Sequence, residues 1–182
     1  MTRDRTILIG LSRLEALHLA GLTTQFMDLL DATELASDDP AVARLVPDAY
    51  VDDAEASREF REVTEADLLT RRREDAAAVL TTLHPLLEAA DDHREAPEDE
   101  GDDDPDDDPA DLDPALLESV PVTIGADDVQ SWLRTLAAIR LVLASRLGIE
   151  AEDDHDDRDP RFGVYDWIGY RLDGLVRAIS ED

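Results

Sequence analysis

The sequence combines enough apolar residues for a core with a large excess of acid. Of its 182 residues 43% are hydrophobic, and 46 Asp and Glu against 17 basic residues give a formal net charge of −29. Such a charge repels phosphate backbones and anionic lipids, so it argues against nucleic-acid and membrane partners. The absence of cysteine excludes disulfides, thiol catalysis and cysteine-bound zinc or iron–sulfur clusters.

The N-terminal segment is predicted to form a short strand and then a long helix. Residues 6–11 are apolar and partly β-branched, which favours a strand. Ser12 and Glu15 have the spacing of a capping box, in which each side chain binds a free backbone N–H of the first helical turn. Apolar residues then recur at helical intervals, so we expect a helix over 14–31.

Three further helices are predicted before residue 90. The Asp-Pro pair at 39–40 is favoured at a helix start and predicts a short helix that Pro47 ends. Another short helix is predicted over 53–62. A separate helix is expected over 64–84, where Pro85 should kink or stop it, because proline lacks the N–H that a helix interior needs.

The next segment differs in kind from the rest of the chain. Residues 91–113 contain 14 acidic residues against one arginine. They offer too little apolar surface to offset an ordering cost of about 1–2 kcal/mol per residue. We therefore predict a disordered acidic linker over 91–118. It divides one helical domain into an N-terminal part, 1–90, and a C-terminal part, 119–182.

The C-terminal part repeats the order of strand and helix. Residues 120–124 predict a second strand, and Asp127 is expected to cap a helix that ends at Leu147, just before Gly148. A second Asp-Pro pair at 159–160 predicts the start of a last helix that runs to the C-terminus.

Together these patterns predict an all-α fold. We expect a single-domain helical bundle of four main helices plus short helices around one core. The two short strands could pair as a small two-stranded β-ribbon at one end of the bundle.

Several strings in both parts of the chain are distinctive in this order. They are DPAVARLVPDAY (39–50), EFR (59–61), TEADL (64–68), WLR (132–134), RLVL (140–143), RLGI (146–149) and YDW (165–167). Together they resemble the actinobacterial domain-of-unknown-function family 2017, over nearly the whole chain except the acidic linker. Val46 before Pro47 is a mild departure from that pattern. The resemblance implies no established activity, cofactor or catalytic residue. Some members of the family are labelled transcriptional regulators.

The sequence contains no motif specific enough to predict a metal site or a catalytic site. The acidic run at 102–108 contains a proline and lacks the glycine of an EF-hand loop, and the run at 152–157 holds a single histidine, His155. Both are predicted to be solvated. The sequence has no Gly-x-Ser-x-Gly string and no glycine-rich phosphate loop. We therefore predict no metal site, no cofactor and no catalytic residue, and a protein that is not an enzyme.

A set of arginines and tyrosines is the best candidate for an interaction surface, because such residues are favoured anchors of protein interfaces. The alternative is that the arginines brace helices through ion pairs. Trp132 and Trp167 are expected in the core. The candidates are Arg44, Tyr50, Arg61, Arg134, Arg140, Arg146 and Tyr165.

These observations favour a non-catalytic protein-interaction or regulatory module, acting on a protein partner or on a second copy. The alternatives are a transcriptional regulator and a metal-dependent enzyme that uses its carboxylates. No specific small molecule is indicated.

No apolar run approaches the roughly 20 residues that span a bilayer, and the N-terminus lacks a signal-peptide core, so we expect the cytoplasm as the location. All basic residues are arginine, which fits either a GC-rich genome or adaptation to high salt.

Overall fold

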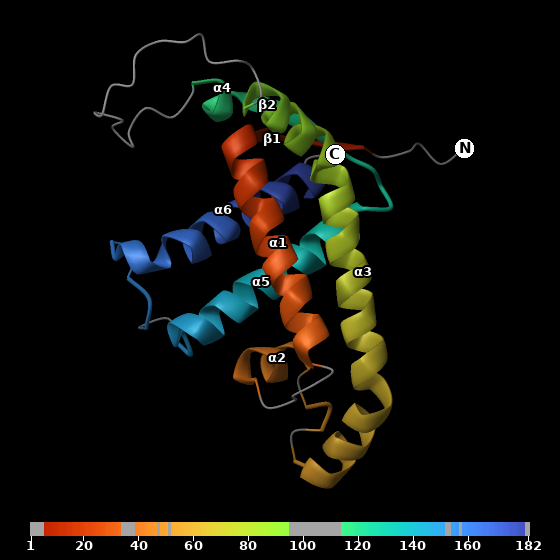
Figure 1. Cartoon of the computed structure of the whole chain (residues 1–182). Helices are drawn as coiled ribbons and strands as arrows, with labels where there is room; N and C mark the ends of the chain where they lie inside the picture. The colour runs from red at the N-terminus through yellow and green to blue at the C-terminus, as the bar shows by residue number, and fades with distance from the viewer. Residues whose placement is uncertain are drawn as a thin grey trace.

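The structure is a computed structural model that describes residues 6–33, 39–46, 48–50, 52–94, 114–151, 154–156 and 158–180, with the side chains of 89–94 left out. It is a helical bundle with one small antiparallel sheet (Figure 1), which confirms the predicted fold class. The elements are β1 (Ile7–Ser12), α1 (Arg13–Thr33), α2 (Pro40–Leu45), α3 (Ala54–Arg94), α4 (Pro114–Leu117), β2 (Ser119–Ile124), α5 (Val129–Leu147), the 3-10 turn η2 (Pro160–Phe162) and α6 (Gly163–Ser180).

The core lies where four helices meet. α1 and α3 lie side by side, and α5 and α6 cross them at a slant (Figure 1). Trp132 of α5 is fully buried there, as predicted, whereas Trp167 of α6 is half-buried. The predicted apolar stripes supply Leu83, Leu136, Ile168 and Leu175 to the fully buried set, and α1 adds Leu19. Other elements add Leu11, Leu45, Ile124 and Phe162.

The two predicted strands pair as a ribbon. β1 and β2 are antiparallel, with Ile7 opposite Ile124 and Ser12 opposite Ser119. A Cβ atom at Gly10 of β1 would lie 2.9 Å from Oγ of Ser119, so a larger residue there would require the serine side chain to shift. Strands from the two halves of the chain therefore close one end of the bundle together.

The predicted capping box forms at the start of α1. The backbone N–H of Glu15 donates to Oγ of Ser12 at 3.2 Å, and Oε2 of Glu15 accepts from the backbone N–H of Ser12 at 2.9 Å. The other carboxylate oxygen, Oε1, accepts from Nε1 of Trp167 at 3.2 Å and pairs with the guanidinium of Arg171. The cap thus also joins α6 to α1.

The two helices predicted over 53–62 and 64–84 form a single helix, α3. Asp53 caps it, since its Oδ1 accepts from the backbone N–H of Ala56 at 3.0 Å. Thr64 was expected to start a new helix, but its Oγ1 donates to the carbonyl of Phe60 at 2.8 Å. A threonine that binds back to the preceding turn is compatible with a continuous helix.

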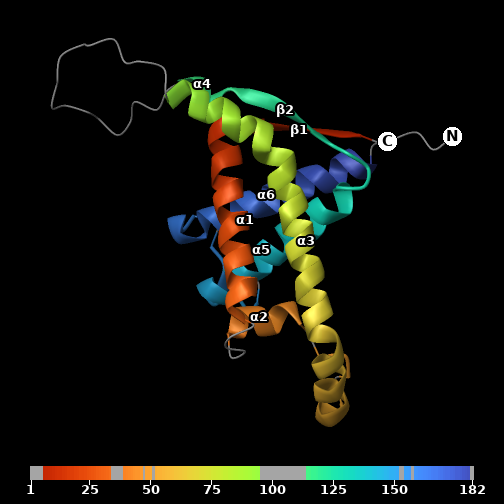
Figure 2. The same ribbon diagram turned by 45° about the vertical axis from the view of Figure 1, so that its right-hand side comes forward.

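Pro85 also lies inside α3 rather than at its end. Its side chain is exposed, so the carbonyl that loses its helical donor faces water. Leu83 is fully buried and Leu86 packs against the core, and both favour the helical path on either side of the proline. The helix changes direction in its last turns, above the strands (Figure 2), as expected for a proline kink.

The predicted linker range overlaps two helices. α3 runs to Arg94 and α4 spans Pro114–Leu117, which was not predicted. Nη1 of Arg13 donates to the carbonyl of Ala115 at 3.4 Å and holds α4 against the start of α1. The rest of the predicted linker, 95–113, lies outside the described residues.

The ends of the C-terminal helices follow the predictions closely. Asp128, one residue after the predicted Asp127, is the N-cap of α5 and makes no side-chain capping bond. Gly148 ends the helix with φ of 73°, a conformation that glycine favours. Asp159 caps η2, which leads directly into α6.

Candidate functional site

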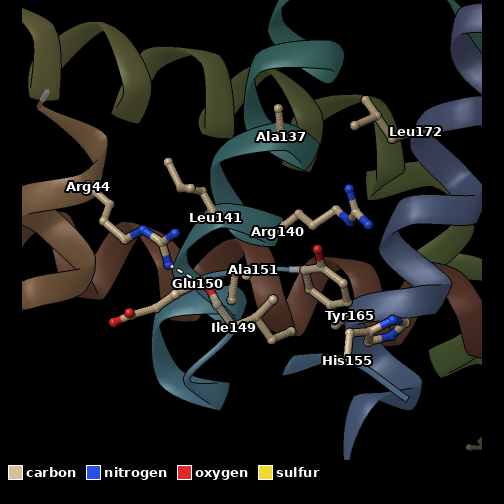
Figure 3. Close-up of a pocket in the computed structure, with 11 residues that line it drawn as sticks. Arg44, Ala137, Arg140, Leu141, Ile149, Glu150, Ala151, His155, Tyr165 and Leu172 are labelled. Carbon is tan, nitrogen blue, oxygen red and sulfur yellow. Dashed lines mark hydrogen bonds between the residues drawn. The ribbon is translucent and has the colours of Figure 1, made fainter. Parts of the chain in front are cut away.

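An open pocket of about 520 Å³ lies between α2, α5, α6 and the segment that follows α5 (Figure 3). Three of the seven predicted interaction residues line it: Arg44 of α2, Arg140 of α5 and Tyr165 of α6. His155 and Glu150 complete its polar lining. The rest of the lining is apolar and consists of Ala137, Leu141, Ala144, Ile149, Ala151 and Leu172.

Arg140 is held in place by one face of α6. Its guanidinium carbon lies 4.2 Å from the centre of the Tyr165 ring, a cation–π contact. The same side chain packs on Gly169, where a Cβ atom would come within 3.1 Å of Nε. Tyr165 and Gly169 are four residues apart, so both lie on the same helical face. Nε of Arg140 is buried and has no hydrogen-bond partner among the described residues.

Arg44 approaches from the opposite side of the pocket (Figure 3). Its Nη1 donates to the carbonyl of Ile149 at 3.1 Å, which links α2 to the end of α5. Asp39 fixes α2 from the other end, since Oδ1 accepts from the backbone N–H of Ala41 at 2.8 Å and Oδ2 pairs with Arg146 at 2.5 Å. Burial raises the pKa of Asp39, but hydrogen bonds from Arg146 and the backbone bring it below its ordinary value.

His155 forms a wall of the pocket, although the sequence predicted a solvated loop there. It is half-buried, with ring centroids 5.0 Å from Phe162 and 5.5 Å from Tyr165. Its Nε2 lies 2.7 Å from Oδ1 of Asp166. These contacts orient the imidazole and hold the chain after α5 against α6.

The two pocket arginines differ from most others in the described part of the chain. Neither Arg44 nor Arg140 has a carboxylate within 4.0 Å there. Seven other arginines do, namely Arg58, Arg61, Arg73, Arg134, Arg146, Arg161 and Arg171. In a chain with 46 acidic residues, two guanidinium groups beside one pocket that have no ionic partner among the described residues make a site suited to an anion.

The comparison with known families agrees with the resemblance seen in the sequence. Residues 1–179 match the profile of a domain of unknown function, DUF2017. The chain belongs to the DUF2017 family. No curated protein and no solved structure matches it.

Two of the predicted residues lie far from the pocket in this DUF2017 protein. The ring of Tyr50 packs edge-on against Phe60, with ring centroids 6.2 Å apart, and Arg61 pairs with Asp48. Both contacts lie at the N-terminal end of α3, which extends away from the other helices (Figure 2). Tyr50, Phe60 and Val63 are exposed there.

The last two predicted residues connect helices. Nη1 of Arg134 lies 3.7 Å from Oδ2 of Asp75, and Oγ of Ser131 donates to Oδ1 of Asp75 at 2.8 Å. These bonds join α5 to α3. Arg146 joins α5 to α2 through Asp39. For Arg134 and Arg146, the alternative of a bracing ion pair is therefore what the contacts show.

Sequence reasoning missed His155, which lines the DUF2017 pocket, and two residues that position the lining, Asp166 beside His155 and Gly169 beside Arg140. The spacing of Tyr165 and Gly169 would have placed them on one helical face. Nothing in the local sequence indicates that Arg140 lies over that face.

Within the described residues, no group of three His, Cys, Asp or Glu side chains is placed to hold a metal ion. The same residues contain no helix long and apolar enough to cross a membrane.

Proposed function

We propose that this DUF2017 protein is a non-catalytic interaction module of the cytoplasm that engages a partner protein through the pocket between α2, α5 and α6. One observation carries the proposal. Arg44, Arg140 and Tyr165 come from three different helices and meet at an open pocket. Arginine and tyrosine are favoured anchors of interfaces, and they are most effective when they are positioned before binding.

Charge supports a protein partner with a mixed surface. The pocket offers guanidinium groups, while the chain as a whole carries a net charge of −29. A partner that presents one negative group within a basic surface would match both features. The cytoplasmic placement rests on the cysteine-free sequence, which needs no oxidising compartment.

The chemistry of the lining favours recognition over catalysis. A His–Asp pair such as His155 and Asp166 also occurs in hydrolases, where the histidine faces a serine or cysteine nucleophile. The described residues that line this pocket include neither. The hydroxyl group in the lining is that of Tyr165, and the ring of this tyrosine supports Arg140.

Site-specific photo-crosslinking tests the proposal. The photo-reactive amino acid p-benzoylphenylalanine would replace Ala137, which lines the pocket and is exposed. The control position is Thr81, which is exposed on α3. In source cells, irradiation should give one discrete adduct from position 137 and none from position 81, identified by mass spectrometry. An adduct of twice the chain mass would make the partner a second copy. Equal or absent labelling at both positions would contradict the proposal.

A further inference from the structure

We propose that the pocket binds a carboxylate carried on an apolar stem, with Arg140 as its principal cation. This assignment rests on the proposed function and names the chemistry that the partner presents. Three observations lead to it. Tyr165 and Gly169 fix the Arg140 side chain, the charge around the pocket limits the charge of the ligand, and part of the pocket lining is apolar.

The guanidinium of Arg140 is oriented before any ligand arrives. The Tyr165 ring lies 4.2 Å from its guanidinium carbon, and Gly169 leaves it just enough room on α6. A planar, fixed guanidinium matches the two oxygens of a carboxylate and loses little side-chain freedom on binding. Its Nε is buried against Gly169, so a ligand would bind the terminal Nη groups of this half-buried side chain.

The second cation sets the direction of approach. Arg44 is tied to the carbonyl of Ile149 at 3.1 Å, and Figure 3 shows it entering the pocket from the side opposite Arg140. In that view the Tyr165 hydroxyl lies between the two guanidinium groups. A carboxylate bound to Arg140 would therefore face Arg44 across the pocket.

The surrounding charge selects a monoanion. Glu150 also lines the pocket, and the whole chain carries a net charge of −29. Each further negative charge on the ligand meets this repulsion again, so a phosphate dianion is disfavoured relative to a carboxylate.

The rest of the lining fits a short hydrocarbon stem. Leu141, Ala144, Ile149 and Leu172 surround the space beside the arginines, and about 520 Å³ is within the usual range for small ligands. A carboxylate with a branched stem has two possible sources with the same chemistry. One is the C-terminal residue of a protein, and the other is a free branched-chain acid.

Calorimetric titration of the full chain at low salt distinguishes these sources. The probes are 3-methylbutanoate, its amide, inorganic phosphate, and the peptide Ala-Ala-Leu with either a free or an amidated C-terminus. We expect each free acid to bind at least about tenfold more tightly than its amide and more tightly than phosphate. Binding of Ala-Ala-Leu with a free C-terminus assigns a protein C-terminus as the source of the carboxylate. Binding of 3-methylbutanoate but not of this peptide assigns a free acid. Tighter binding of phosphate, or no binding of either acid, would overturn the assignment.

Substitutions locate the binding. Arg140→Gln should weaken carboxylate binding at least about tenfold, whereas Arg71→Gln, which removes an exposed arginine of α3, should change it less than about twofold. A folded Arg140→Gln protein with unchanged affinity would refute the role of Arg140. If Arg140→Gln does not fold, Gly169→Ala serves instead. Its added methyl group pushes the guanidinium out of place, and it should also weaken binding.

The same variant separates this inference from the proposed function. If Arg140→Gln removes the cross-linked adduct but the wild type binds no carboxylate, the interaction stands and its chemistry is misassigned. If the wild type binds carboxylates and Arg140→Gln leaves the adduct unchanged, the carboxylate site stands and the proposed partner surface is refuted.

Discussion

At the scale of single residues, the Glu15 side chain connects two helices and a helix cap outside the pocket. One oxygen caps α1 through Ser12, and the other binds Trp167 and Arg171. Burial lowers the pKa of Arg171, and the close carboxylate of Glu15 offsets the cost of desolvating its charge. Trp167 is half-buried, and its indole N–H donates to this carboxylate.

Glu15→Ala should therefore lower the free energy of unfolding by about 2–3 kcal/mol. It removes a helix cap and leaves the half-buried Arg171 without its carboxylate. Urea denaturation followed by circular dichroism measures the change. Glu62→Ala is the control, since its contact with Arg58 is long and exposed and should contribute less than about 0.5 kcal/mol. Similar losses in both variants would show that Glu15 acts only as a surface charge.

At the scale of elements, the end of α5 fixes the position of two elements that line the pocket, α2 and the segment after α5. α5 ends at Gly148, and the backbone N–H of Ile149 then donates to the carbonyl of Ala144 at 2.8 Å. This turn places the carbonyl of Ile149 where Arg44 binds it. The C-terminal cap of one helix therefore determines how α2 approaches α5.

Gly148→Ala should destabilise the protein by about 1 kcal/mol, because a Cβ atom is strained at a φ of 73°. Gly21→Ala is the matched control. Gly21 is exposed within α1 and has no atom near its missing Cβ, so alanine there should stabilise by about 0.5–1 kcal/mol. Thermal or urea unfolding of both variants gives the comparison. Equal effects of the same sign would contradict the role of the left-handed turn.

At the scale of the whole molecule, the excess of acid opposes compaction. With 46 acidic and 17 basic residues, repulsion outweighs attraction over most of the surface. Most of the ion pairs among the described residues have an exposed partner, so they contribute little to stability. The apolar core around Trp132 must offset this repulsion.

Added salt should therefore stabilise the protein. Raising sodium chloride from about 20 mM to about 0.5 M shortens the screening length several-fold and weakens the repulsion. The urea midpoint is expected to rise over this range, with urea chosen because it adds no charge. Sucrose separates screening from a general effect of cosolutes, since it stabilises without screening. A falling midpoint would mean that ion pairs, and not repulsion, dominate the electrostatic energy.

The sequence alone predicted the elements that depend on neighbouring residues. The capping box at Ser12 and Glu15, the Asp-Pro start at Asp39 and the helix end at Gly148 are local interactions, and each was found where expected. The division of α3 at Thr64 was wrong, because the hydroxyl that was expected to cap a new helix binds the carbonyl of Phe60 in the preceding turn and the helix continues.

For the candidate site, the sequence could name the residue types but not their grouping. It determined that this acidic chain folds as a helical bundle and that its arginines and tyrosines are the candidates for contact, because composition and periodicity are properties of the chain itself. Only the tertiary structure decided that Arg140 rests on Tyr165 and Gly169 facing Arg44, while Tyr50 and Arg61 lie elsewhere. The reason is that helix packing brings together residues that are roughly 25 to 100 positions apart. No local pattern encodes such contacts.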